Sequence, residues 1–262
     1  MKKGDKDYIL VKSVLLAGMI ITACGGETYR AEDTMGRMLV AGGATEPEIN
    51  VFSTSLSVSF VDTSGEVFSI SKRIKERGID LGKITVVNEI SRRFCAGAIT
   101  VEEAYEMLLA AEKKKSEYKP LLVMACQVLT PIAFTILLGG RLSDCIVSGL
   151  NGVIIALITA LQQRMMLHPA MFNFLIGLCV ALFSYSLNTL PFVSVDFFVL
   201  LPGSIMALLP GVTLTNGVHD LLNADFMSGG ARLIEAVVTA TTLAVGVGFG
   251  LAIAANVFGG TL

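Results

Sequence analysis

Polar side chains gather between residues 213 and 225, inside a carboxyl-terminal half that is otherwise apolar. The stretch carries Thr213, Thr215, Asn216, His219, Asp220, Asn223 and Asp225. If residues 216–223 are helical, four of these side chains, spaced i, i+3, i+4 and i+7, share one face: Asn216, His219, Asp220 and Asn223. Amides, an imidazole and a carboxylate on one face can hydrogen-bond a small polar solute and hold a proton. His219 suits a loop or an interface as readily as a proton relay.

Glu235 is a second candidate because it lies at the start of an apolar run, next to Ala236. A carboxylate inside a membrane span is costly unless it faces a cavity or a partner, so such a residue is a functional candidate by default. Asp144 and Asp196 lie at the ends of apolar runs, where we expect solvated carboxylates.

Two Pro-Gly pairs precede the polar stretch, Pro202-Gly203 and Pro210-Gly211. Proline removes a helical hydrogen bond, so we expect the helix to break at these pairs. Freed backbone groups at membrane depth are tolerated only where protein or a water-filled cavity satisfies them. Transporters build substrate sites from such breaks. The alternative is an ordinary kinked span followed by a turn.

The chain divides sharply by charge near Lys119 and Pro120. Residues 1–119 hold 17 of the 20 Lys and Arg and 17 of the 22 Asp and Glu. We therefore predict two domains, residues 1–118 and 119–262. The balanced charge of the first gives no basic patch, so we expect no nucleic-acid partner.

Charge-free runs in the second domain predict about five transmembrane helices, because a helix needs about 20 apolar residues to cross the hydrocarbon core. The predicted spans are 121–139, 145–163, 169–188, 195–213 and 232–257. Within the last, Gly246 and Gly250 form a small-xxx-small face suited to close helix packing. The fold class is thus an α-helical integral membrane protein with a small α+β domain before it.

Positive charges indicate the orientation of these spans in the lipid bilayer. Arg92, Arg93, Lys113, Lys114, Lys115 and Lys119 precede the first span. By the positive-inside rule, the amino-terminal domain is then cytosolic and residues 215–229 lie on the cytosolic side. Five spans place the carboxyl terminus outside.

The first domain is predicted to be α+β. Residues 13–23 resemble a lipoprotein signal ending at Cys24, but the stretch is short and acidic residues precede it. We favour an amphipathic helix of a folded domain. Further helices are expected at 28–40, capped by Thr28, at 80–96, and from Thr100 to about 115, with a capping box. Residues 49–61 are predicted to form one strand, paired with 66–71 in a hairpin.

No catalytic group is recognisable in the first domain, since residues 1–119 contain no His, phosphate-binding loop or nucleophile elbow. The five cysteines lack metal-ligand spacing. We therefore expect no enzyme, cofactor or metal. Adjacent Glu32 and Asp33 form either a solvated helix face or a contact that gates the membrane part.

The chain resembles the threonine/serine exporter family of bacteria and archaea over nearly its whole length. In the first domain the resemblance rests on residues 25–35, GGETYRAEDTM. In the second it rests on residues 210–216, PGVTLTN, on 219–222, HDLL, and on 228–236. The resemblance implies an exporter linked to the proton motive force, moving threonine and serine, or dicarboxylates such as succinate in some relatives.

The resemblance also implies a partner. Some members fuse two membrane halves, and others split them, so this chain looks like the first half and its partner would be a small membrane protein. Homo-oligomerisation is left open. The family motif points to Asn216, Asp220 and Glu235, with Pro210 and Gly211 shaping the break and with Glu32 and Asp33 marked in the first domain.

Three functions compete at this point. The leading hypothesis is an exporter subunit in the cell membrane, in which Glu235 or Asp220 cycles its proton. The second is a membrane-anchored ligand sensor or scaffold that acts through its cytosolic domain. The third, an intramembrane enzyme, lacks any paired-acid, metal or nucleophile signature.

Overall fold

The computed structural model describes residues 3–61, 65, 67–75, 78–114, 118–162, 169–190 and 194–258. The described chain is mostly helical and separates into two compact units. One, the α+β unit, contains residues 1–115 together with 212–234. The other, the apolar helical unit, contains residues 116–211 together with 235–262. This division differs from the predicted one, into residues 1–118 and 119–262, because residues 212–234 group with the amino-terminal part.

The sheet of the α+β unit has three antiparallel strands in the order β1-β2-β3. These are β1 (Thr45–Phe52), β2 (Ser55–Val61) and β3 (Val67–Arg73). The prediction of one strand over 49–61 is wrong, because the chain turns at Ser53 and Thr54 and Phe52 pairs with Ser55. This two-residue turn lacks the Asn or Gly that usually marks a tight hairpin.

The pairing of β2 with β3 confirms the predicted hairpin, although residues 62–64 and 66 lie outside the described part. Alternation along β2 is also as predicted. Leu56, Val58 and Phe60 are buried, while the serines between them are half-buried. The sheet therefore has one apolar face, and this face packs on helices.

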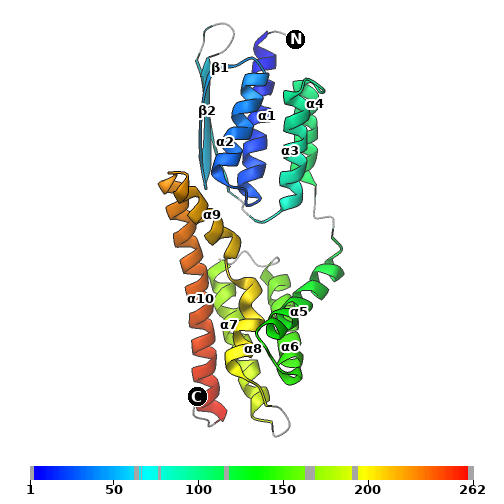
Figure 1. Cartoon of the computed structure of the whole chain (residues 1–262), viewed down its shortest axis with the longest axis vertical. Coiled ribbons are helices and arrows are strands. Elements are labelled where there is room, and N and C mark those ends of the chain that lie inside the picture. The colour runs from blue at the N-terminus through cyan, green and yellow to red at the C-terminus, as the bar shows by residue number, and fades with distance from the viewer. Residues whose placement is uncertain are drawn as a thin grey trace. The chain divides into compact units, whose positions relative to one another are not determined.

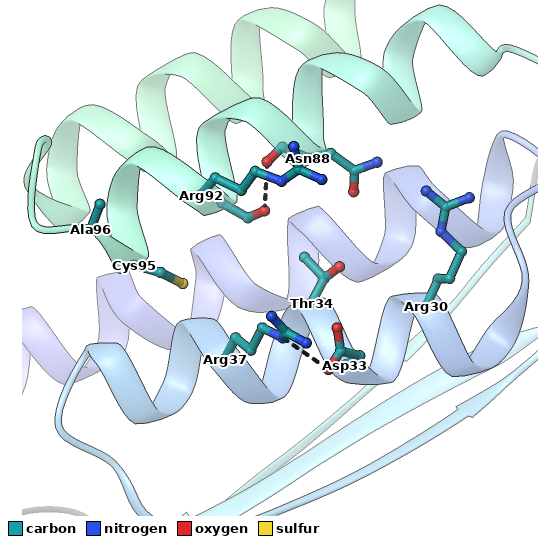
Figure 2. Close-up of a pocket in the computed structure, with 9 residues that line it drawn as sticks. Arg30, Asp33, Thr34, Arg37, Asn88, Arg92, Cys95 and Ala96 are labelled. Carbon is teal, nitrogen blue, oxygen red and sulfur yellow. Dashed lines mark hydrogen bonds and ion pairs between the residues drawn. The ribbon is translucent and has the colours of Figure 1, made fainter.

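Four helices precede or follow the sheet within residues 1–115. They are α1 (Lys3–Ala23), α2 (Thr28–Ala41), α3 (Leu81–Cys95) and α4 (Val101–Lys113). Asp80 caps α3 through Lys83 N–H, and both halves of the predicted capping box between Thr100 and Glu103 are present at α4. Helices α2 and α3 pack side by side (Figure 2), and α1 packs against α2, α3, α4 and β2.

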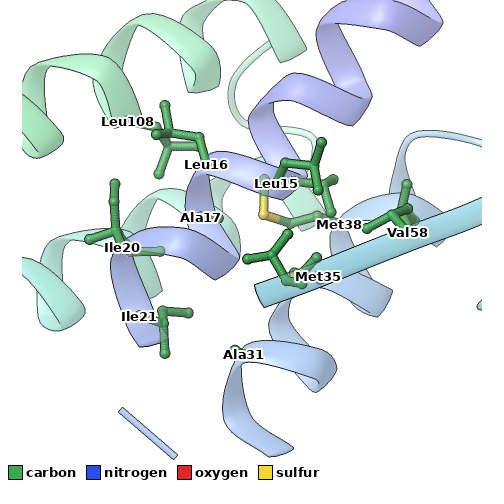
Figure 3. Packing of buried hydrophobic residues seen from close by; sticks show 14 of the residues in the cluster. Leu15, Leu16, Ala17, Ile20, Ile21, Ala31, Met35, Met38, Val58 and Leu108 are labelled. Atoms are coloured by element: carbon green, nitrogen blue, oxygen red, sulfur yellow. The ribbon is translucent and has the colours of Figure 1, made fainter. Parts of the chain in front are cut away.

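Helix α1 is the centre of this core (Figure 3), surrounded by residues of α2, α4 and β2. Eight of its apolar residues are buried: Leu10, Val11, Val14, Leu15, Leu16, Ala17, Ile20 and Ile21. The expectation of an amphipathic helix is wrong, since residues 10–22 are all buried except Lys12 and Met19, which are partly buried. This also explains why residues 13–23 resemble a signal segment.

The apolar helical unit contains α5 (Pro120–Leu137), α6 (Leu142–Gln162), α7 (Pro169–Asn188), α8 (Phe197–Ile205) and the 3-10 turn η1 (Met206–Leu208). After a break at residues 209–210 come α9 (Gly211–Leu222) and α10 (Phe226–Phe258), seen in Figure 1. Residues 226–234 of α10 belong to the α+β unit and residues 235–258 to the apolar unit.

Among the described residues, four helices are long and apolar enough to cross a membrane: α5, α6, α7 and α10. A fifth span results if α8, η1 and α9 together count as one interrupted crossing. The predicted five spans are the upper end of this range. The expected break at Pro202 is wrong, because α8 continues through Pro202 and Gly203, and the interruption comes only before Gly211.

Close helix contacts hold α7 against α10. A Cβ added to Gly250 would lie 2.6 Å from the Leu178 carbonyl oxygen, and one added to Gly246 would collide with the Phe174 carbonyl. The rings of Phe174 and Phe249 also lie 5.9 Å apart. The predicted small-residue face of the last span thus packs directly on a neighbouring backbone.

Candidate functional site

Asp220 lies at the centre of a buried polar cluster in the α+β unit. Its side chain is fully buried on α9, and its Oδ1 accepts hydrogen bonds from the Thr28 hydroxyl at 2.8 Å and from the Thr28 backbone N–H at 3.4 Å. Arg232 Nε lies 3.2 Å from its other oxygen, Oδ2, at ion-pair distance. Oδ2 accepts no hydrogen bond from the described residues, so the guanidinium charge is its main compensation.

Thr28 joins two carboxylates that are distant from it in sequence. Its hydroxyl also lies 3.1 Å from Asp225 Oδ2, and Asp225 Oδ1 accepts from the Ser228 N–H at 3.0 Å at the start of α10. A hydroxyl has one hydrogen to donate, so the two carboxylates share it. Thr28 was expected to cap α2. That expectation is wrong, because Glu27 occupies the cap position and Thr28 begins the helix.

Backbone carbonyls of Gly25 and Gly26 complete the cluster. Arg232 Nη2 donates to Gly26 O and Asn216 Nδ2 donates to Gly25 O, each at 2.8 Å. Gly25 has φ +87°, and a Cβ on Gly26 would lie 2.8 Å from Ile21 O. Glycine is therefore needed at both positions, and the turn they form presents two acceptors to α9 and α10.

Two glycines bring α9 and α10 together so that Asp220 and Arg232 can meet. A Cβ on Gly229 would lie 2.8 Å from Gly217 O. The two backbones are therefore in contact, and side chains just beyond this point face each other at short range.

Glu32 is the next carboxylate, on α2. Its Oε1 accepts a hydrogen bond from Val51 N–H at 3.0 Å. Burial raises the pKa of the Glu32 carboxyl, the Val51 hydrogen bond opposes this, and the charges of Asp225 and Asp220 raise it further. We call Thr28, Glu32, Asp220, Asp225 and Arg232 the Asp220 cluster.

The predicted helix face of residues 216–223 divides between two environments. Asn216 and Asp220 contact the residues 25–28 turn as described above. The His219 ring instead lies tilted beside the Tyr29 ring, with centroids 5.2 Å apart, and His219 Nδ1 lies 3.1 Å from Asn223 Nδ2. The remaining predicted residues of α9 are Thr213, half-buried, and Thr215, exposed.

The other predicted residues lie elsewhere. Asp33 is exposed and pairs with Arg37 at 2.9 Å, so Glu32 and Asp33 belong to different surroundings. Glu235 is an exposed residue in the part of α10 that belongs to the apolar unit. Pro210 and Gly211 lie at the break before α9, and Gly203 lies inside α8, where a Cβ would meet the backbone of Thr135.

A second polar cluster lies in the apolar unit, and sequence reasoning missed it. Five fully buried side chains from α5, α6, α7 and α8 form it: Thr135, Ser148, Asn151, Ser184 and Ser204. Thr135 donates to Ser148 at 2.8 Å, while Asn151 Nδ2 donates to Ser184 at 2.9 Å and to Ser204 at 3.0 Å. We call this set the hydroxyl–amide cluster.

Asn151 Oδ1 is buried and has no hydrogen-bond partner among the described residues. An unpaired buried acceptor costs about 1–3 kcal/mol. A solute that brings a donor to this amide would remove that cost. The sequence signal was available, because Ser148 and Asn151 are polar residues three positions apart within an apolar run.

Asp144 corrects another expectation, since it is 1% exposed rather than solvated. Its two oxygens accept backbone N–H groups from Arg141 at 2.8 Å and from Asp196 at 2.9 Å. It fixes the start of α6 beside the start of α8. Asp196 itself caps α8 through Phe198 N–H.

In the described part of the chain, no group of three or more His, Cys, Asp and Glu is placed to hold a metal ion. The two clusters instead offer hydrogen bonding, charge pairing and proton exchange. The hydroxyl–amide cluster can bind a neutral or zwitterionic polar group, and in the Asp220 cluster Glu32, whose pKa is raised by burial, can hold a proton.

Comparison with known proteins gives one family and several distant relatives. Residues 12–254 match the family described as "Putative threonine/serine exporter". "Probable threonine/serine exporter" of Mycobacterium tuberculosis is 21% identical over 91% of this chain and 45% of its own length. "Pheromone-regulated membrane protein 10" of Eremothecium gossypii is 26% identical over 90% of this chain and 31% of its own length.

"Pheromone-regulated membrane protein 10" of Kluyveromyces lactis is 23% identical, over 90% of this chain and 24% of its own length. The chain thus spans less than half the length of these curated relatives. No solved structure matches it.

Proposed function

Because this chain belongs to the threonine/serine exporter family, we propose that it is a subunit of a secondary exporter of small polar organic molecules. The substrate class is threonine and serine or a dicarboxylate such as succinate, and export is coupled to the proton motive force. The subunit lies in the cell membrane with its amino-terminal domain, residues 1–118, in the cytosol. A small membrane protein supplies the second half.

The observation that carries this proposal is the hydroxyl–amide cluster. It is fully buried among helices that are apolar enough to cross a membrane, and it leaves the Asn151 carbonyl oxygen without a donor. Hydroxyls and an amide are the groups that would bind the hydroxyl or ammonium group of a small amino acid. Polar groups inside spans line substrate pathways in transporters.

Glu235 is the proposed proton carrier, since it is the carboxylate of the apolar unit that lies on a candidate span away from the helix caps. Asp220 is less suited to that task, because it lies in the α+β unit and is held there by Thr28 and Arg232. In this proposal the Asp220 cluster has a structural role, fixing α9 and the start of α10 on the residues 25–28 turn.

Transport into inverted membrane vesicles tests the proposal, using labelled threonine, serine and succinate with an imposed proton gradient. Ser184→Ala should lower the rate about tenfold, the usual scale for one hydrogen bond to a polar substrate. Ser186→Ala is the matched control on α7, because its hydroxyl donates to Phe183 O in its own helix. Equal rates for both variants with all three solutes would overturn the proposed site.

The proton role needs its own variant. Glu235→Gln keeps the size of the side chain and removes the charge, so transport should lose its dependence on the imposed proton gradient. Exchange of labelled for unlabelled solute should continue. Gradient-driven export that stays at the wild-type rate contradicts the assignment of Glu235.

A further inference from the structure

Two helix faces in the α+β unit line one groove of about 490 Å³. Its walls carry side chains at matching helical spacing, i, i+3, i+4 and i+7, from each helix. Helix α2 contributes Arg30, Asp33, Thr34 and Arg37, and α3 contributes Asn88, Ser91, Arg92 and Cys95. We call this the α2–α3 groove. Neither cluster described above has a residue in it.

The lining is positively charged, with three arginines and one aspartate. Arg37 forms an ion pair with Asp33 at 2.9 Å. Their side chains are 72% and 56% exposed, so this ion pair contributes little to stability. Arg30 lies 3.3 Å from Glu27 through Nη1 alone, which leaves its other N–H groups available. Arg92 has no ion-pair partner among the described residues.

Neutral hydrogen-bonding groups lie beside these charges. Thr34 and Ser91 are buried at 9% and 8% exposure, and the Ser91 hydroxyl donates to Asn88 O at 3.0 Å. Figure 2 shows the Asn88 amide beside the guanidinium of Arg92, with Thr34 below them and the guanidinium of Arg30 to one side. The groove thus offers charged and neutral donors from both walls.

We propose that the α2–α3 groove binds a small dianion. Arg30 and Arg92 come from opposite walls, so each can hold one anionic group with the fork of N–H donors that suits a carboxylate or phosphate. The Asn88 amide adds a neutral donor. The volume lies within the usual range for small-molecule sites. The site does not depend on the exporter function proposed above.

Calorimetric titration of the full chain in detergent micelles tests this, with succinate and inorganic phosphate as separate probes. Acetate at equal ionic strength is the monoanion control. We expect one of the dianions to bind at least tenfold more tightly than acetate, and the better probe tells a dicarboxylate site from a phosphate site. Equal binding of acetate, or no binding of either dianion at 10 mM, overturns the proposal.

Two neighbouring arginines on α3 provide a matched pair of variants. Arg92→Gln removes a lining guanidinium and should weaken binding about tenfold or more, the scale of one charged hydrogen bond. Arg93→Gln removes an exposed charge that does not line the groove and should leave binding unchanged. Arg92→Lys should give an intermediate affinity, since a lysine keeps the charge without the fork.

If Arg93→Gln weakens binding as much as Arg92→Gln, the effect comes from the general charge of the unit and the groove is not the site. Circular dichroism of each variant shows that the helices remain intact, which is expected because Arg92 and Arg93 are both exposed. Transport plays no part in this readout, so a failed export experiment leaves the binding result unaffected.

Discussion

Asp220 and Arg232 are twelve positions apart, yet they form a buried pair whose side chains are 0% and 7% exposed. Such a pair contributes little net stability, because the desolvation of both charges offsets their attraction. Removing one partner is different, since it leaves the other charge buried without compensation. The pair therefore acts mainly to define one arrangement of α9 and α10.

Arg232→Gln should lower the free energy of unfolding by about 3–5 kcal/mol, because it leaves the buried Asp220 carboxylate without its charge partner. The double variant Asp220→Asn, Arg232→Gln should recover part of this loss. Thermal unfolding of the full chain in detergent measures both, with Arg141→Gln as an exposed control. A single variant no less stable than the Arg141 control would contradict the buried-pair interpretation.

Glu32 gives a prediction in pH. Its pKa is raised in the folded state, so the folded chain binds more protons than the unfolded chain between the two pKa values, and stability falls as pH rises through that window. Glu32→Gln has no titrating carboxyl at this position, so it does not lose stability in this way as pH rises. Relative to wild type, the variant should gain stability as pH rises from about 4, the ordinary value for glutamate, and then level off. Unfolding curves from pH 4 to 8 measure this, and a constant difference would exclude it.

At the scale of elements, the capping box of α4 is a local device. Thr100 accepts from Glu103 N–H at 3.2 Å, and Glu103 Oε2 accepts from Thr100 N–H at 2.7 Å. Thr100→Ala should cost about 1 kcal/mol of stability. Thr85→Ala is the control, because that hydroxyl bonds Leu81 O within α3 and caps nothing. Chemical unfolding of both variants makes the comparison.

The contact between α7 and α10 predicts opposite effects for two neighbouring glycines. Gly246→Ala places a methyl group against Phe174 O and should destabilise the protein by about 1–3 kcal/mol. Gly248→Ala meets nothing within 4 Å and should be neutral or slightly stabilising. Thermal unfolding in detergent distinguishes them, and equal losses would mean that close packing is not the cause.

The elements that could be predicted from sequence are those with strong local signals. Uninterrupted apolar runs located α5, α6 and α7, and the Thr100 capping box located α4. The turn at Ser53 lacks a typical turn residue and was missed. Thr28 resembled a cap because its true partners, Asp220 and Asp225, lie about 190 positions away in sequence. The hydroxyl–amide cluster requires four helices to meet, and helix pairing is not encoded in periodicity.

For the whole molecule, the orientation of the chain across the membrane remains a prediction that labelling can test. In a chain without its native cysteines, Lys72→Cys and Asn256→Cys introduce exposed thiols at β3 and near the end of α10. If α8, η1 and α9 complete a fifth crossing, an impermeant thiol reagent should reach these positions from opposite sides. With four crossings it should reach both from one side, which would overturn the five-span topology.

The division into units also could not be read from composition. Residues 212–234 follow the apolar helices in sequence, but Asn216, Asp220 and Arg232 bind the residues 25–28 turn, so this segment belongs to the α+β unit. Charge counts therefore locate the place near residue 116 where the chain first leaves the α+β unit. They do not show that residues 212–234 return to that unit. The returning segment is recognised through its side-chain partners.

The glycine contacts between α7 and α10 have a mechanical consequence. Two backbones touching at Gly177, Gly246 and Gly250 cannot slide without a collision, so these helices should move as one body. Distances between spin labels on α7 and α10 should therefore stay constant while solute is transported.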